Sequence, residues 1–109
     1  MADSVQKVTD AEIAEYKKQV PTWVILEPDG EKRLEHVYKF KDFATALAFT
    51  NKVGEIAEAE GHHPAILTEW GSVGVAWWTH TIRGLQYLDF IMAARTDEAY
   101  RAFEGSDQL

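Results

Sequence analysis

The chain has 109 residues and no cysteine, with 46% hydrophobic, 12% aromatic and 27% charged residues. This length and composition predict one folded domain over residues 1–109, and they exclude global disorder, a disulfide framework and any site that needs a thiolate. Eighteen acidic residues against eleven basic residues give a net charge of −7, which argues against direct DNA or RNA binding because such binding needs a basic surface.

The first third of the chain predicts a helix followed by a hairpin. Thr9 or Asp10 can cap a helix over residues 11–19, because a short side-chain oxygen accepts hydrogen bonds from the free amides of a first turn. Two apolar runs then flank a Pro-Asp-Gly turn, which predicts antiparallel strands over residues 23–26 and 32–40.

The rest of the chain predicts a long helix, a second hairpin and a last helix. Residues 42–60 carry apolar side chains at helical spacing, and Gly61 can end that helix in the left-handed conformation. The apolar stripe is wider than one packing surface needs, so we expect part of it to meet a partner subunit. Strands are expected over residues 65–70 and 73–80, joined by Gly71 and Ser72, and a helix over residues 85–103.

The predicted order is therefore helix, two strands, helix, two strands, helix. Two hairpins separated by a long helix predict an α+β fold, with a four-stranded antiparallel sheet and three helices packed on one face. The polar segment 1–10 lacks the apolar core of a secretory signal, and the uncharged segment 70–82 is too short to cross a bilayer. We therefore expect a cytoplasmic protein with no membrane span.

Three of the four histidines lie at the ends of predicted elements. His62 and His63 separate the long helix from the next strand, so their side chains should diverge, and His80 ends the last strand. Imidazole titrates near neutrality, which suits general acid and base catalysis. An isolated histidine pair is more often structural or on the surface, which is also expected for His36, and Glu58 in isolation would be a surface charge. A metal site is a weaker alternative, because the pair lacks the helical spacing of metal ligands and no cysteine contributes.

The tryptophans fall into two groups. Trp23, Trp70 and Trp77 occupy alternating strand positions and are expected in the core. Trp78 shares a predicted strand face with His80, so it can pack against a planar heteroaromatic ligand. An interface role explains Trp78 about equally well.

The histidine segment resembles the pterin-4a-carbinolamine dehydratase family. The residues that carry the resemblance are, in order, Glu58, His62, His63, Pro64, Trp70, Thr79, His80 and Asp89. Further similarities are the Phe-Lys-Asp-Phe run at residues 40–43 and the Gly-Leu pair at residues 84–85, so the resemblance covers about residues 8–103. The sequence departs from the family at residues 86–88, where members are usually more polar, and at residues 77–78, where members often have smaller side chains.

The resemblance implies a reaction and a set of site residues. The substrate would be a 4a-hydroxytetrahydropterin released by an aromatic amino acid hydroxylase, and the products would be a quinonoid dihydropterin and water. His62 and His80 would be the general acids, His63 would mainly hold the ring, and Glu58 would orient an imidazole or contact the pterin. The binding wall would comprise Gly61, His62, His63, Trp78, Thr79, His80 and Thr81. Pterin would be the substrate, and no metal or redox cofactor would be required.

Asp89 has two explanations. It belongs to the family pattern, but an Asp at a helix N-terminus can also satisfy first-turn amides and favour the positive end of the helix dipole. The structural role is the one we expect, so that changes at Asp89 would affect stability before chemistry.

The resemblance also bears on partners and on an alternative function. Relatives form dimers and tetramers, so a homodimer or homotetramer is expected, and a hydroxylase is the candidate protein partner. The alternative is a non-catalytic dimerisation or interaction module, similar to a transcriptional coactivator or an assembly factor, because a fold can persist after an activity is lost.

Overall fold

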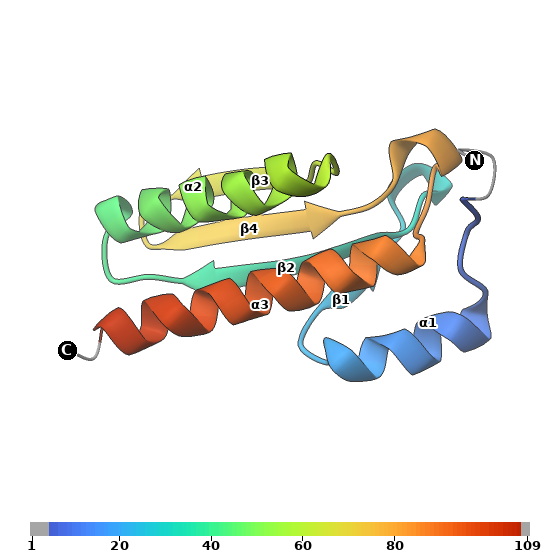
Figure 1. Cartoon of the computed structure of the whole chain (residues 1–109), viewed down its shortest axis with the longest axis horizontal. Coiled ribbons are helices and arrows are strands. Elements are labelled where there is room, and N and C mark those ends of the chain that lie inside the picture. Colours follow the sequence, from blue (N-terminus) through green and yellow to red (C-terminus); the bar gives the residue numbers. More distant parts are fainter. Residues whose placement is uncertain (1–4, 108–109) are drawn as a thin grey trace.

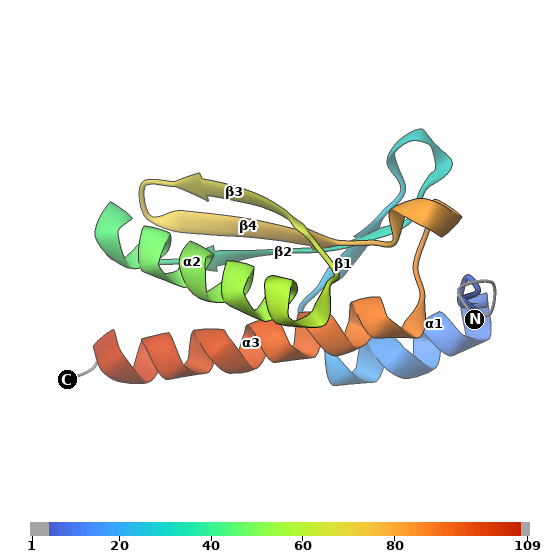
Figure 2. The ribbon, with the colours of Figure 1, turned by 45° about the horizontal axis from the view of Figure 1, so that its top comes forward.

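The computed structural model describes residues 5–107, and it confirms the α+β fold and the predicted order of elements (Figure 1). One antiparallel sheet has the strand order β1-β2-β4-β3, formed by β1 (Val24–Leu26), β2 (Arg33–Lys39), β3 (Ala65–Glu69) and β4 (Ser72–Trp77). The helices lie on one side of this sheet (Figure 2), and they are α1 (Asp10–Tyr16), α2 (Phe43–Glu60) and α3 (Tyr87–Asp107). Short 3-10 turns are η2 (Lys17–Gln19), η3 (Pro28–Gly30) and η4 (His80–Ile82). None of the described helices is long and apolar enough to cross a membrane.

The inner face of the sheet carries the core. The register pairs Leu34 with Trp77 and Tyr38 with Val73 across β2 and β4, so these side chains share the face that the helices cover. All four are at most 2% exposed. Burying a large apolar side chain contributes about 1.5–3 kcal/mol, so this layer is the main source of stability. The long helix α2 adds the buried residues Ala46, Phe49, Val53 and Ala57.

A polar contact inside this layer joins the first hairpin to α3. The indole Nε1 of Trp23 and the hydroxyl of Tyr38 both donate to Oδ1 of Asp97, at 2.9 and 2.5 Å. Burial, together with the Asp97 carboxylate, raises the pKa of Tyr38 well above its usual range, so the hydroxyl stays protonated and keeps donating. The ring of His36 packs against Trp23 and Tyr38, in line with a structural role for this histidine.

The helix ends follow the sequence signals. Thr9 caps α1, since its Oγ1 accepts from the amide of Glu12 at 3.1 Å and its own amide donates to the Glu12 carboxylate at 2.8 Å. Asp42 caps α2 by accepting from the amide of Thr45 at 2.8 Å. Gly61 ends α2 with φ of 66°, a conformation that glycine adopts without strain.

Two helix boundaries differ from the expected ones. The predicted first helix divides into α1 and the 3-10 turn η2. The last helix begins at Tyr87 and continues past Phe103. Both differences leave the element order unchanged.

The second hairpin has a different turn from the predicted one. Glu69 pairs with Ser72, so the two-residue loop consists of Trp70 and Gly71. Gly71 has φ of 78°, which suits glycine at this place in a tight turn. Trp70 therefore lies outside the sheet and is 75% exposed, and the prediction that it belongs to the core is wrong.

Strand β4 also ends earlier than predicted. Thr79 forms an isolated bridge with Gly84, in which the Thr79 amide donates to the Gly84 carbonyl at 2.8 Å. The bridge closes a small loop that contains η4 and ends at Arg83, whose φ is 55°. His80 therefore lies outside the strand, and it does not share a strand face with Trp78 as the sequence predicted.

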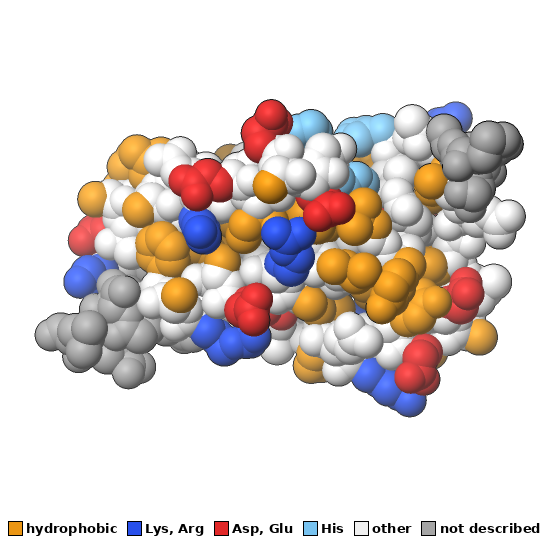
Figure 3. All heavy atoms as spheres, viewed as in Figure 1, with side chains coloured by type: hydrophobic (Ala, Val, Ile, Leu, Met, Phe, Trp, Pro, Cys, Tyr) orange, Lys and Arg blue, Asp and Glu red, His pale blue; other side chains and the backbone are white. Residues whose placement is uncertain are grey.

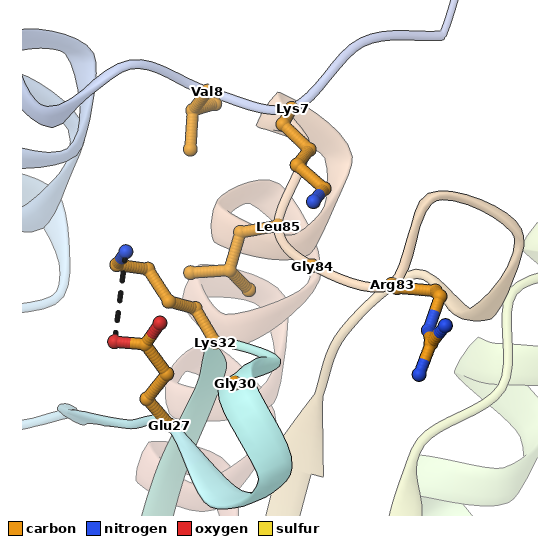
Figure 4. A pocket seen from close by; sticks show the side chains of 8 residues that line it. All are labelled: Lys7, Val8, Glu27, Gly30, Lys32, Arg83, Gly84 and Leu85. Carbon is orange, nitrogen blue, oxygen red and sulfur yellow. Dashed lines mark ion pairs between the residues drawn. The ribbon is translucent and has the colours of Figure 1, made fainter.

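The segment before α1 is fixed to the turn that precedes α3. The amide of Val8 donates to the carbonyl of Leu85 at 2.9 Å. Figure 4 shows Lys7, Val8 and Leu85 around a pocket of about 130 Å³ at this place. The hydrogen bond between Val8 and Leu85 thus links the N-terminal segment to the residues just before α3.

Candidate active site

Three segments meet at one end of the sheet: the residues after α2, those after β4, and the start of α3. They surround an open pocket of about 380 Å³, a volume within the range of small-molecule sites. The lining residues are Gly61, His62, His63, Thr79, His80, Thr81, Gln86 and Leu88. Figure 3 shows histidine side chains gathered in one region of the surface, near the end of α2. The fold thus brings together most of the residues that the sequence singled out.

His62 is the most deeply placed imidazole of this pocket. Its Nε2 lies 2.6 Å from Oδ1 of Asp89, and the two side chains are 13% and 0% exposed. Its ring also stacks on the indole of Trp77, with centroids 5.7 Å apart and an interplanar angle of 15°. Because Nε2 is bonded to Asp89, Nδ1 is the ring nitrogen of His62 without a hydrogen bond among the described residues.

Asp89 accepts hydrogen bonds on both carboxylate oxygens. Its Oδ2 accepts from the Thr79 hydroxyl at 2.8 Å and from the Gln86 amide at 2.9 Å. The side-chain amide of Gln86 donates to the same Thr79 hydroxyl at 2.9 Å. Burial raises the pKa of Asp89, and the hydrogen bonds from Gln86, His62 and Thr79 oppose that rise by stabilising the carboxylate.

Asp89 therefore makes two kinds of contact, one at the start of α3 and one with a histidine of the pocket. The bond from the Gln86 amide, just before α3, is a contact at the helix end, although the sequence predicted contacts with the amides of the first turn. The bond to His62 is one that sequence reasoning missed, because it joins residues from different elements. The part played by Gln86 was missed as well, although its place three residues before Asp89 is a signal for a contact at a helix start.

His63 points away from its neighbour, as expected. Its Nε2 lies 2.7 Å from Oε2 of Glu58 on the last turn of α2. Both side chains are well exposed, at 62% and 80%, so the pair contributes only about 0–1 kcal/mol to stability. Glu58 is therefore close enough to orient the His63 ring at the rim of the pocket.

His80 reaches the same pocket from the first residue of η4. Its exposed side chain contacts the ring of Trp78, with centroids 4.7 Å apart and an interplanar angle of 54°. Trp78 itself is 7% exposed and is absent from the pocket lining. The structure therefore places Trp78 against His80 and not in the wall that the resemblance implied.

Metal binding needs several ligands around one point. In the part of the chain that the structure describes, no group of three or more His, Cys, Asp or Glu side chains is arranged in this way. His62 and His63 are each bonded to a different carboxylate.

Comparison with known proteins points to one family. The family model described as pterin 4 alpha carbinolamine dehydratase matches residues 6–99. The chain belongs to this family. It is similar to a transcriptional coactivator/pterin dehydratase from Brucella melitensis, with 30% sequence identity and a TM-score of 0.78, over 86% of this chain and 98% of that one.

A second solved structure is similar in fold alone. It is a pterin dehydratase-like protein identified as a RuBisCO assembly factor in the alpha-carboxysome, with 23% identity and a TM-score of 0.61. The match covers 72% of this chain and 88% of that one. The fold of the dehydratase family thus also occurs in a protein described as an assembly factor.

Proposed function

We propose that this family member is a hydro-lyase that converts a 4a-hydroxytetrahydropterin to a quinonoid dihydropterin and water. It would act in the cytoplasm and recycle the pterin cofactor of an aromatic amino acid hydroxylase, its candidate partner. The observation that carries the proposal is that three imidazoles, His62, His63 and His80, line one pocket, and that a fully buried carboxylate holds the innermost of them. A pocket of about 380 Å³ is large enough for a flat bicyclic ring.

The dehydration needs proton transfer in two places. The C4a–O bond breaks as a general acid protonates the leaving hydroxyl, while the N5 electron pair forms the C4a=N5 double bond and N5 loses its proton. The proton gained by the hydroxyl and the proton lost from N5 balance, so the reaction consumes no cofactor. An imidazole that titrates near neutrality is suited to either transfer.

The arrangement of the pocket supports a division of roles. His62 and His80 are the general-acid candidates, because His62 is held firmly by Asp89 and His80 enters from another element. His63, oriented by Glu58, would hold the pterin ring at the rim. Gly61, Thr79 and Thr81 would form the remaining wall.

Direct assay tests this proposal. Purified protein at neutral pH, without added metal, is expected to accelerate the decay of the 4a-carbinolamine absorbance. The control is the doubly substituted His62→Ala/His80→Ala protein, whose rate should approach the uncatalysed one. A wild-type rate no faster than the uncatalysed decay would contradict the dehydratase assignment.

The open face of the sheet favours a second candidate function, a non-catalytic interaction module. The face opposite the helices exposes Val24, Leu26, Val37 and Leu67 by 47–62%. Exposed apolar side chains that cluster in this way are typical of protein interfaces. A stoichiometric protein partner recovered by pull-down, from a protein without turnover, would favour this function over the enzyme.

Self-association is expected in either case, as a homodimer or homotetramer. Phe43 and Leu47 lie one turn apart on α2 and remain 46% and 44% exposed, and β3 is an edge strand of the sheet. Light scattering should give a mass of two or four chains at micromolar concentration. If α2 forms the interface, Leu47→Glu should lower the mass, and Val37→Glu on the other face should not. A monomeric wild-type protein would contradict this prediction.

A further inference from the structure

A cation lies on the ring that supports His80. The guanidinium carbon of Arg33, at the start of β2, is 4.0 Å from the centroid of the Trp78 ring. The same indole contacts the imidazole of His80. Arg33 and His80, which are far apart in the sequence, are therefore connected through one aromatic side chain.

Packing holds Arg33 in this position. Its Nε is buried and has no hydrogen-bond partner among the described residues. Glu31, the nearest preceding acid in the hairpin, is paired with Arg83 at 3.0 Å. A buried guanidinium nitrogen without a partner is costly, and the contact with the indole offsets part of that cost.

His80 depends on the Trp78 contact more than His62 depends on any one neighbour. The His62 ring is fixed by a carboxylate and by a stacked indole. For the His80 side chain, no hydrogen bond is found within the described part of the chain, and its ring contact is with Trp78. The contact with Trp78 is therefore the one that limits the orientation of the exposed His80 ring.

We propose that Arg33 is a positioning residue for His80, acting through Trp78. The inference rests on the proposed function, in which His80 transfers a proton to the substrate. The guanidinium restrains the Trp78 ring from the side of the sheet, and the restrained ring limits the orientations of the imidazole. A proton donor held in few orientations is more often aligned with the leaving hydroxyl.

The same arrangement gives a role to each of the two adjacent tryptophans at the end of β4. Trp77 points to the inner face and stacks on His62, whereas Trp78 contacts His80. Each indole thus supports one of the two general-acid candidates. The Trp-Trp pair together with Arg33 forms a support for both imidazoles.

The test uses Arg33→Met, which keeps an unbranched side chain and removes the planar cation. We expect kcat to fall about tenfold while KM changes less than about twofold, because alignment is lost and the wall of the pocket is intact. The NMR signals of the His80 ring protons should shift toward those of an exposed histidine as the ring-current effect of Trp78 is averaged. Arg33→Lys keeps the charge without the planar group, and it should recover only part of kcat.

Lys32→Met is the matched control. Lys32 is the neighbouring cation in the same hairpin, and Figure 4 shows it paired with Glu27, at 3.7 Å. This variant should leave kcat and the His80 signals unchanged. An equal fall in kcat for Lys32→Met and Arg33→Met would overturn the inference, because the effect would then be one of net charge.

The NMR measurement separates this inference from the proposed function. If wild-type protein turns over the carbinolamine and Arg33→Met changes neither kcat nor the His80 signals, the inference is wrong and the function stands. If wild-type protein has no activity and only Arg33→Met moves the His80 signals, the proposed function fails and the control of His80 by Arg33 is supported.

Discussion

His62→Ala and His80→Ala are each expected to lower kcat by about a hundredfold or more, the usual contribution of a positioned general acid or base. The two variants should differ in stability. His80 is exposed and makes no buried hydrogen bond among the described residues, so its removal should leave the melting temperature nearly unchanged. His62→Ala removes a hydrogen-bond partner from the buried Asp89 carboxylate, which should cost about 1–3 kcal/mol. Turnover assays and thermal unfolding measure both effects.

His36→Ala is the control for these two variants. The His36 ring packs against Trp23 and Tyr38 on the helix side of the sheet, and it does not line the pocket. The substitution should lower stability and leave kcat close to that of the wild type. Equal losses of turnover in folded His36→Ala and His80→Ala proteins would show that the wrong imidazoles have been assigned.

Local sequence signals were sufficient for the order of elements, for the start of α1 and for the ends of α2. The caps at Thr9, Asp42 and Gly61 depend on residues within one turn, and such short-range contacts are readable from sequence. The position of Trp70 was not readable in this way, because an aromatic residue suits a strand as well as a hairpin loop. The pairing of Glu69 with Ser72 between β3 and β4 places Trp70 in the loop.

The end of β4 and the inner structure of the site depend on contacts between distant segments. The bridge from Thr79 to Gly84 removes His80 from the strand, and an alternating pattern gives no sign of that bridge. The histidines could be selected from the sequence because of their order and spacing. Their supports could not, because the bond between His62 and Asp89 forms only when the end of α2 lies beside the start of α3.

The bond between Asp89 and His62 reverses the expectation from the sequence that Asp89 acts on stability before chemistry. Asp89→Asn is now expected to lower kcat about as far as His80→Ala, with little change in the melting temperature at neutral pH. Asparagine keeps the shape of aspartate and one acceptor oxygen, which can still accept from the Thr79 hydroxyl and the Gln86 amide, so the start of α3 should persist. Its NH₂ group then faces Nε2 of His62. That contact requires Nε2 to accept, which moves the ring proton to Nδ1 and removes the anion that stabilises the imidazolium.

The same variant has an expected pH dependence of stability. Burial raises the pKa of Asp89 above the value of 3.8 for an unperturbed Asp, so the folded protein binds this proton more tightly than the unfolded chain does. The contribution of Asp89 to stability is therefore greatest below the unfolded pKa and declines as pH rises through the folded pKa. Asparagine has no such titration, so the melting temperature of Asp89→Asn relative to wild type should improve between about pH 4 and pH 7.

Asp97→Asn is the matched control, because Asp97 is another α3 carboxylate that accepts from buried donors, Trp23 and Tyr38, away from the pocket. It should change the melting temperature about as little as Asp89→Asn does, because asparagine keeps an acceptor oxygen there too, and it should leave kcat near the wild-type value. If Asp89→Asn also keeps its turnover, then Asp89 acts only at the helix end. If turnover collapses in Asp89→Asn alone, Asp89 belongs with His62 in the proton-transferring machinery.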